Sequence, residues 1–264
     1  PFDMYGTFVI EEKFGFNMTR LRTFVADRLK GVGLGLVIGL PLLSGILILF
    51  ELGGSAAWLW CWAATAIFTL AMHFVIPVWV MPLFNEFTPL SDGGLKDAIF
   101  KYGRSVNFSI SNIFVIDGSR RSSHSNAFFT GFGSAKRVVL FDTLIESHTE
   151  AEIVAVVAHE VGHYKKRHII TGTIISVLHV GLLFFLLSQF LHNPGLHEAF
   201  FMDHVTIYAG IVFFGLLYKP VELILSLAMH GISRLNETQA DIWAVDTLEQ
   251  PEALASGLKR LAAK

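Results

Sequence analysis

Long apolar stretches alternate with segments of mixed composition along this chain. Four stretches stay almost free of charge over the length at which an α-helix crosses a bilayer, which is about 20 residues. These stretches are residues 32–52, 56–80, 169–191 and 205–230. The pattern therefore predicts four membrane-spanning helices. Inside the fourth, Lys219 and Glu222 are expected to pair with each other, because ionisable groups are costly within a membrane.

The segment between the second and third stretches has a different pattern. Short apolar runs at 112–116 and 137–141 are bounded by turn residues and predict β-strands. From about Thr149, apolar positions recur at helical spacing and continue through His168 into the third stretch. We therefore expect a small globular insert, whose last helix runs without interruption into the membrane.

Composition and charge support this membrane assignment. Hydrophobic residues make up 53% of the 264 residues and charged residues 16%, with a mean hydropathy of +0.55. A net charge of −2 excludes the basic field that recruits nucleic acid. Neither connection at 53–55 or 192–204 contains Lys or Arg. Because cytoplasmic loops are enriched in these residues, the insert and both ends of the chain are predicted to face the cytoplasm.

The helix expected around residue 160 contains a metal-binding pattern. His159 and His163 are separated by one helical turn, which lets two imidazoles grip one zinc ion. Glu160 lies beside them and is the candidate general base for activating water. The only cysteine is Cys61, so a metal site must use His and carboxylate ligands. Taken alone, the pattern could also be the polar face of an amphipathic helix.

A second acidic segment supplies the rest of a plausible zinc site. Glu237 and Asp241 share a helix face near the end of the chain. A carboxylate from Glu237 would complete a site with two His ligands and one carboxylate, leaving a fourth position open. Asp241 could then orient a ligating imidazole. We expect one zinc ion per chain, held by His159, His163 and Glu237.

These elements predict a mainly α, polytopic helical membrane protein with a small α/β zinc-peptidase insert that carries the HExxH helix. Residues 1–82 would hold an N-terminal segment and two transmembrane helices, and 83–168 the cytosolic insert with a short β-sheet. Residues 169–230 would add two transmembrane helices, and 231–264 a helix supplying the third ligand. The chain starts at Pro1 and stops within an apparent helix, so a fragment of a longer protein is expected.

Several further motifs give the chain a family resemblance. They are residues 8–12 (FVIEE), 14–17 (FGFN), 82–85 (PLFN), 87–90 (FTPL), 122–127 (SSHSNA), 139–144 (VLFDTL) and 233–234 (SR). With the zinc motif, in this order, the chain resembles the membrane-integrated gluzincins of the Ste24 type, which are CAAX prenyl proteases of peptidase family M48. The resemblance spans nearly the whole chain.

The resemblance implies zinc on His159, His163 and Glu237, catalysis by Glu160 and a chamber within the membrane that opens towards the cytosol. It implies about seven spans, against the four expected here. It also matches Asn126, Ala127 and Phe128 to a strand beside the metal. A free strand edge can bind a peptide backbone. By the same resemblance, Arg234 accompanies the third ligand and is expected to support Glu237 or a substrate carboxylate.

Three functions compete at this point. The first is a zinc endopeptidase that cuts near the C-terminus of prenylated or other hydrophobic substrates. The second is a membrane quality-control metalloprotease of the HtpX type, and the third an inactive membrane scaffold. The expected partners are a peptide or protein substrate and the lipid bilayer, with no nucleic acid. The membrane would be the bacterial inner membrane, or the endoplasmic reticulum in a eukaryote.

Overall fold

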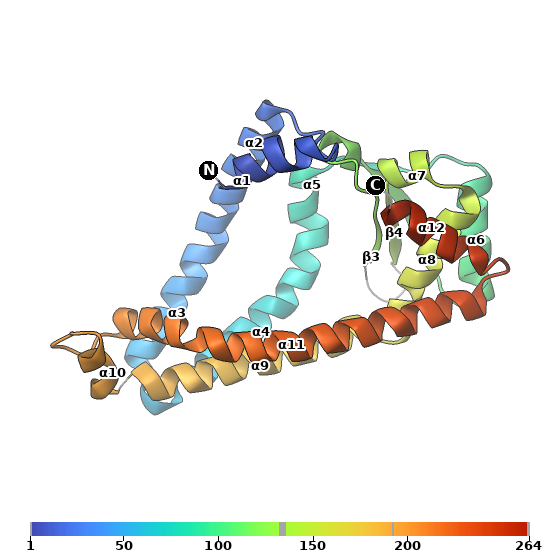
Figure 1. Ribbon diagram of the computed structural model, residues 1–264. Coiled ribbons are helices and arrows are strands. Elements are labelled where there is room, and N and C mark those ends of the chain that lie inside the picture. Colours follow the sequence, from blue (N-terminus) through green and yellow to red (C-terminus); the bar gives the residue numbers. More distant parts are fainter. Residues whose placement is uncertain (1, 132–135, 192, 263–264) are drawn as a thin grey trace. The chain divides into compact units, whose positions relative to one another are not determined.

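The computed structural model describes residues 2–131, 136–191 and 193–262 (Figure 1). The chain forms two compact units. One, the sheet unit, comprises residues 1–30, 74–168 and 236–264. The other, the span unit, comprises residues 31–73 and 169–235.

Four helical segments of the described chain are long and apolar enough to cross a membrane, which confirms the four predicted spans. They are Leu21–Leu52, Gly54–Phe84, His168–Leu191 and Ile207–Thr247. The first is built from α2 (Leu21–Leu34), η2 (Gly35–Gly39) and α3 (Leu40–Leu52), and the second from η3 (Gly54–Ala56), α4 (Ala57–Val75), η4 (Ile76–Val80) and α5 (Met81–Phe84). The third is α9 (His168–Leu191) and the fourth α11 (Ile207–Thr247). The protein is an integral membrane protein.

Aromatic and aliphatic side chains hold the span unit together. Its buried cluster comprises Phe50, Ala57, Cys61, Phe184, Leu187, Leu191, Phe214 and Tyr218. Trp62 packs where Gly181 leaves room, and its indole N–H donates to the carbonyl oxygen of Val177 at 2.8 Å. The expected pair is present, because Lys219 Nζ lies 2.7 Å from Glu222 Oε2.

A four-stranded sheet forms the centre of the sheet unit, with strand order β1-β2-β4-β3. Its strands are β1 (Phe87–Pro89), β2 (Asn112–Ile116), β3 (Ala127–Thr130) and β4 (Arg137–Phe141). The two strands predicted from the sequence, β2 and β4, pair in parallel, with Phe114 opposite Val139. β1 and β3 are antiparallel to their neighbours. Because β3 comes last in the strand order, it lies at one edge of the sheet.

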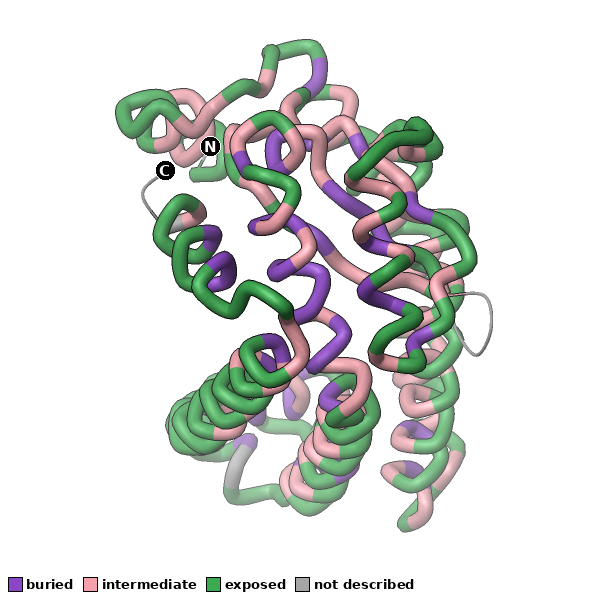
Figure 2. The backbone as a smooth tube through the Cα atoms, turned by 90° about the vertical axis from the view of Figure 1, so that its right-hand side faces the viewer, coloured by how far each residue is buried: buried purple, intermediate pink, exposed green. Residues whose placement is uncertain are grey.

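The core of this unit lies between the sheet and α8 (Glu150–Lys165), with α6 (Gly94–Ser105) and α12 (Glu252–Ala262) packed against α8 (Figure 1). Apolar residues on α8 such as Ile153, Val157 and Val161 are at most 2% exposed. In Figure 2 buried positions gather in the strands and in α8, whereas the long helices are mainly exposed or half-buried. The remaining short elements are α1 (Phe2–Tyr5), η1 (Gly6–Glu11), η5 (Gly118–Arg120), α7 (Asp142–Ser147) and α10 (Pro194–Ala199).

The predicted uninterrupted helix from Thr149 into the third span is wrong. α8 ends at Lys165 and α9 begins at His168, with a turn between them. Arg167 adopts a left-handed conformation with φ of 61°, which a helix cannot contain. Lys165 also bonds outside its helix, because its Nζ donates to the carbonyl oxygens of Val106 at 2.8 Å and Asn107 at 3.2 Å. Helical periodicity continues across the break, so the sequence pattern conceals it.

Candidate metal centre

Helix α8 holds the HExxH motif rigidly. Thr149 caps its N-terminus, where its hydroxyl accepts from the backbone N–H of Glu152 and the Glu152 carboxylate accepts from the N–H of Thr149. Such a reciprocal cap satisfies two backbone donors that would otherwise lack partners. The apolar face of α8 is buried in the core, and His159, Glu160 and His163 lie on its half-buried side.

The structure brings the three predicted ligands together. His159 Nε2 lies 3.1 Å from His163 Nε2, and Glu237 Oε2 lies 3.3 Å from the first nitrogen and 3.6 Å from the second. Bonds of about 2.0–2.2 Å to a tetrahedral zinc ion place ligand atoms roughly 3.3–3.6 Å apart. The type of ligand and their spacing therefore fit zinc.

Gly162 makes this approach of α8 and α11 possible. A Cβ atom at this position would meet the backbone of Ala240 at 3.0 Å and the Cβ of Trp243 at 3.1 Å. Ala240 is fully buried there. A side chain here would require the backbone of Ala240 to move by a few tenths of an ångström, so glycine favours the close approach between the two helices. The sequence analysis had assigned no role to this glycine.

Asp241 contacts the imidazole of His159 on the side away from the other ligands. Its Oδ1 lies 2.8 Å from His159 Nδ1, so the ring donates Nδ1–H to the carboxylate and leaves Nε2 free to bind a metal. The contact is present, and the orienting role of Asp241 stays a prediction. Arg234 precedes Glu237 on α11 but belongs to the span unit, and its role stays a prediction.

The electrostatic environment suits acid–base chemistry. Burial raises the pKa of Glu160 from 4.5 to about 7, while His159 opposes the rise and Glu237 adds to it. Burial and the neighbouring His159 lower the pKa of His163. Lowering the pKa of a histidine favours its neutral form at neutral pH, and the neutral imidazole is the form that binds metal. A carboxyl group with a pKa near neutrality can both accept and release a proton.

The predicted substrate segment lies on β3 and just before it, and β3 packs against α8. The carbonyl oxygen of Asn126 accepts from the N–H of Phe141 at 3.0 Å, and Ala127 is 2% exposed. Phe128 is half-buried. The side chain of Ala127 therefore belongs to the core, and it could meet a peptide only through its backbone.

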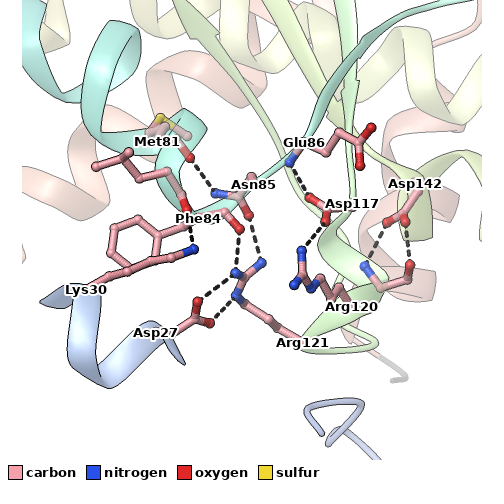
Figure 3. Close-up of polar contacts among 12 residues, drawn as sticks. Asp27, Lys30, Met81, Phe84, Asn85, Glu86, Asp117, Arg120, Arg121 and Asp142 are labelled. Carbon is pink, nitrogen blue, oxygen red and sulfur yellow. Dashed lines mark hydrogen bonds and ion pairs between the residues drawn. The ribbon is translucent and has the colours of Figure 1, made fainter. Parts of the chain in front are cut away.

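Arg121 lies in the loop that leads to β3, and it connects three segments that are distant in sequence (Figure 3). Its guanidinium donates to the carboxylate of Asp27 at 2.8 and 3.1 Å, to Asn85 Oδ1 at 3.2 Å and to the carbonyl oxygen of Phe84. Its own carbonyl oxygen accepts from Met18. The side chain of Arg121 thus joins α2 to the motif at 82–85, and its backbone contacts Met18, which directly follows the motif at 14–17. The sequence analysis did not single out this arginine.

Comparison with protein families gives two matches. The family described as CAAX prenyl protease N-terminal, five membrane helices, matches residues 1–86. Peptidase family M48 matches residues 89–263. Together the two matches cover nearly the whole chain, and both are descriptions of peptidases.

Individual relatives agree. The chain is 40% identical over 267 residues to a probable CAAX prenyl protease 1 of Schizosaccharomyces pombe, covering 99% of this chain and 55% of that protein. It is 40% identical over 260 residues to CAAX prenyl protease 1 of Saccharomyces cerevisiae, covering 92% and 57%. The crystal structure of S. mikatae Ste24p matches with a TM-score of 0.92 and 38% identity, over 99% of this chain and 64% of that one. The chain thus spans little more than half the length of these curated relatives.

Proposed function

This chain belongs to peptidase family M48, and we propose that it carries the catalytic centre of a zinc-dependent endopeptidase embedded in a membrane. The observation that carries the proposal is the convergence of His159, His163 and Glu237, whose ligand atoms lie within 4.8 Å of one another, beside Glu160. M48 is a family of metallopeptidases, so a metal is implied. We propose one zinc ion per chain at these three residues.

The protein residues have distinct roles in this proposal. A zinc ion held there supplies Lewis-acid polarisation of a carbonyl group and lowers the pKa of water. Glu160 accepts the proton of the attacking water at its carboxylate and donates it to the nitrogen of the leaving amine. Asp241 keeps His159 in the tautomer that binds metal through Nε2. Arg234 is proposed to support Glu237 or a substrate carboxylate.

The substrate is proposed to bind along the edge strand β3. An extended peptide could pair with the backbone of this strand near Asn126, Ala127 and Phe128, as in other cases of β-strand addition. Since the relatives are named CAAX prenyl proteases, we propose prenylated C-termini as substrates ahead of a quality-control role of the HtpX type. The four residues of the metal centre are all in place, which disfavours an inactive scaffold.

We propose that the metal centre faces the cytoplasm, in the inner membrane of a bacterium or the endoplasmic reticulum of a eukaryote. The distribution of Lys and Arg supports this orientation, because the connections 53–55 and 192–204 lack both. The proposed division is an N-terminal segment with two spans (1–82), the peptidase insert (83–168), two further spans (169–230) and a C-terminal segment with the third ligand (231–264). The predicted separate helix for this ligand is wrong, because Glu237 lies on α11, the helix of the fourth span.

The substitution Glu160→Gln tests the proposal. The chain in detergent is incubated with a farnesylated peptide and its unmodified counterpart, and zinc is measured by elemental analysis. We expect one zinc ion to stay bound while the cleavage rate falls by roughly 10²–10⁴-fold, the usual contribution of a general base. Glu150→Gln, at an exposed position on the same helix, is the control and should retain full activity. Unchanged cleavage by the Glu160 variant would refute the role of this residue, and equal cleavage of both peptides would favour the quality-control alternative.

A further inference from the structure

His168 is a buried histidine that the proposed chemistry does not use. It is 8% exposed and follows directly after the turn that ends α8. Its Nδ1 lies 3.0 Å from Nδ1 of His163, and its Nε2 lies 3.1 Å from Oε1 of Gln239 on α11. The rings of His168 and His163 meet edge to face, with centroids 5.0 Å apart. His168 thus approaches the nitrogen of His163 that is not directed at Glu237.

The broken helix creates this contact. On an uninterrupted helix, residues five positions apart point in directions that differ by roughly 140°, so His168 could not reach His163. The left-handed Arg167, with φ of 61°, redirects the chain between them. A non-glycine residue keeps this unfavourable conformation only where surrounding contacts impose it. Here those contacts are the bonds of His168 to His163 and Gln239 and the bonds of Lys165 to Val106 and Asn107.

One arrangement of protons satisfies both hydrogen bonds and leaves Nε2 of His163 ready to bind a metal. Gln239 Oε1 can only accept, so His168 donates from Nε2. In a neutral imidazole the other nitrogen is then an acceptor, and His163 must donate Nδ1–H to it. That leaves Nε2 of His163 bare towards Glu237 and His159. If His168 instead donated from Nδ1 to His163, the proton of His163 would lie on Nε2, and this nitrogen could not bind metal.

The two candidate histidine ligands therefore have different supports. Asp241 supports His159 with a negative charge, whereas His163 rests on the uncharged pair His168 and Gln239.

We propose that His168 and Gln239 are positioning residues that hold His163 in the orientation and tautomer needed for metal binding. The inference rests on the proposed zinc centre. It extends the metal-binding unit from the HExxH motif across the helix break to a third histidine that is not itself a ligand.

Zinc affinity of the full chain in detergent tests the proposal, measured by competition with a chromophoric chelator. His168→Phe keeps an aromatic ring but removes the acceptor, and we expect zinc to bind roughly 10–100-fold more weakly, the usual effect of losing such a support. His168→Asn restores an acceptor and should bind within about threefold of wild type. His148→Phe is the matched control, because His148 is also 8% exposed but bonds to Ser147, and its zinc affinity should be unchanged.

Two further measurements separate the possible outcomes. The visible absorption of the cobalt-substituted protein should change in His168→Phe and not in His168→Asn, because it reports ligand geometry directly. If His168→Phe does not fold, Gln239→Leu decides, since Gln239 is exposed and its loss should weaken zinc binding several-fold. Wild-type affinity and an unchanged cobalt spectrum in the folded His168→Phe variant, or in Gln239→Leu, would overturn the positioning role alone. Absence of zinc binding by the wild-type chain would instead overturn the proposed function.

Discussion

The sheet unit and the span unit place their large apolar residues in opposite ways. In the sheet unit, side chains such as Leu140 and Leu144 are fully buried between the strands and α8. In the span unit, Leu223 and Leu227 are 63% and 66% exposed, and both lie on α11. Water expels apolar surface, whereas lipid tails do not. The same residue type is therefore a core residue in one unit and an exposed residue on a membrane-spanning helix in the other.

Polar contacts differ as well. The sheet unit uses linked networks, such as those around Arg121 and the three candidate metal ligands. The span unit has smaller groups of bonds, for example the single bond from Trp62 to Val177 and the short chain that links His73 to Thr69 and Thr173. Close packing of side chains should therefore contribute a larger share of the free energy of unfolding in the span unit than in the sheet unit. Paired substitutions can test this comparison.

The largest effect is expected from shortening a leucine in the two environments. Leu140→Ala opens a cavity in the sheet unit and should destabilise it by about 2–5 kcal/mol. Leu227→Ala removes a side chain that lipid can replace, so a change within about 0.5 kcal/mol is expected. Thermal unfolding in detergent measures both. Similar losses would mean that Leu227 packs against protein, contrary to the comparison.

A smaller effect is expected from removing neighbouring arginines. Arg121→Ala leaves Asp27 and the carbonyl oxygen of Phe84 without their charged partner, and about 2 kcal/mol should be lost. Arg120→Ala is the control, because its guanidinium is 54% exposed and lies 3.6 Å from Asp117, so less than about 1 kcal/mol is expected. Thermal midpoints and the rate of proteolysis around residues 17–19 give the readout. If the control loses as much as the Arg121 variant, the network does not have the role described.

The smallest effect is expected from filling a helix surface in the span unit. A Cβ atom at Gly181 would lie 2.8 Å from the ring of Trp62, so Gly181→Leu should destabilise the unit by about 1–2 kcal/mol. At Gly172, on the same helix, an added Cβ meets no atom within 4 Å, so Gly172→Leu should be neutral. In a Trp62→Ala background the penalty of Gly181→Leu should disappear, so a double-mutant cycle of thermal midpoints should give non-additive effects. Additive effects would show that the glycine does not accommodate the indole.

Much of the fold was predictable because its signals are local. The four spans follow from long apolar runs, and β2 and β4 follow from short apolar runs between turn residues. The pairing of His159 with His163 depends only on the repeat of one helix, which is the same in any α-helix. The break after Lys165 was missed, because its causes are the backbone of Arg167 and contacts to residues 106 and 107.

The amino-acid sequence alone thus determined which segments enter the membrane and which helix face carries the histidines. Only the tertiary structure decided that Glu237 reaches both imidazoles, that Gly162 lets α11 approach, and that His168 turns back towards His163. Periodicity describes the directions of side chains along one element. The distance between elements far apart in sequence depends on how their volumes pack and on where the backbone bends, and no local pattern encodes either.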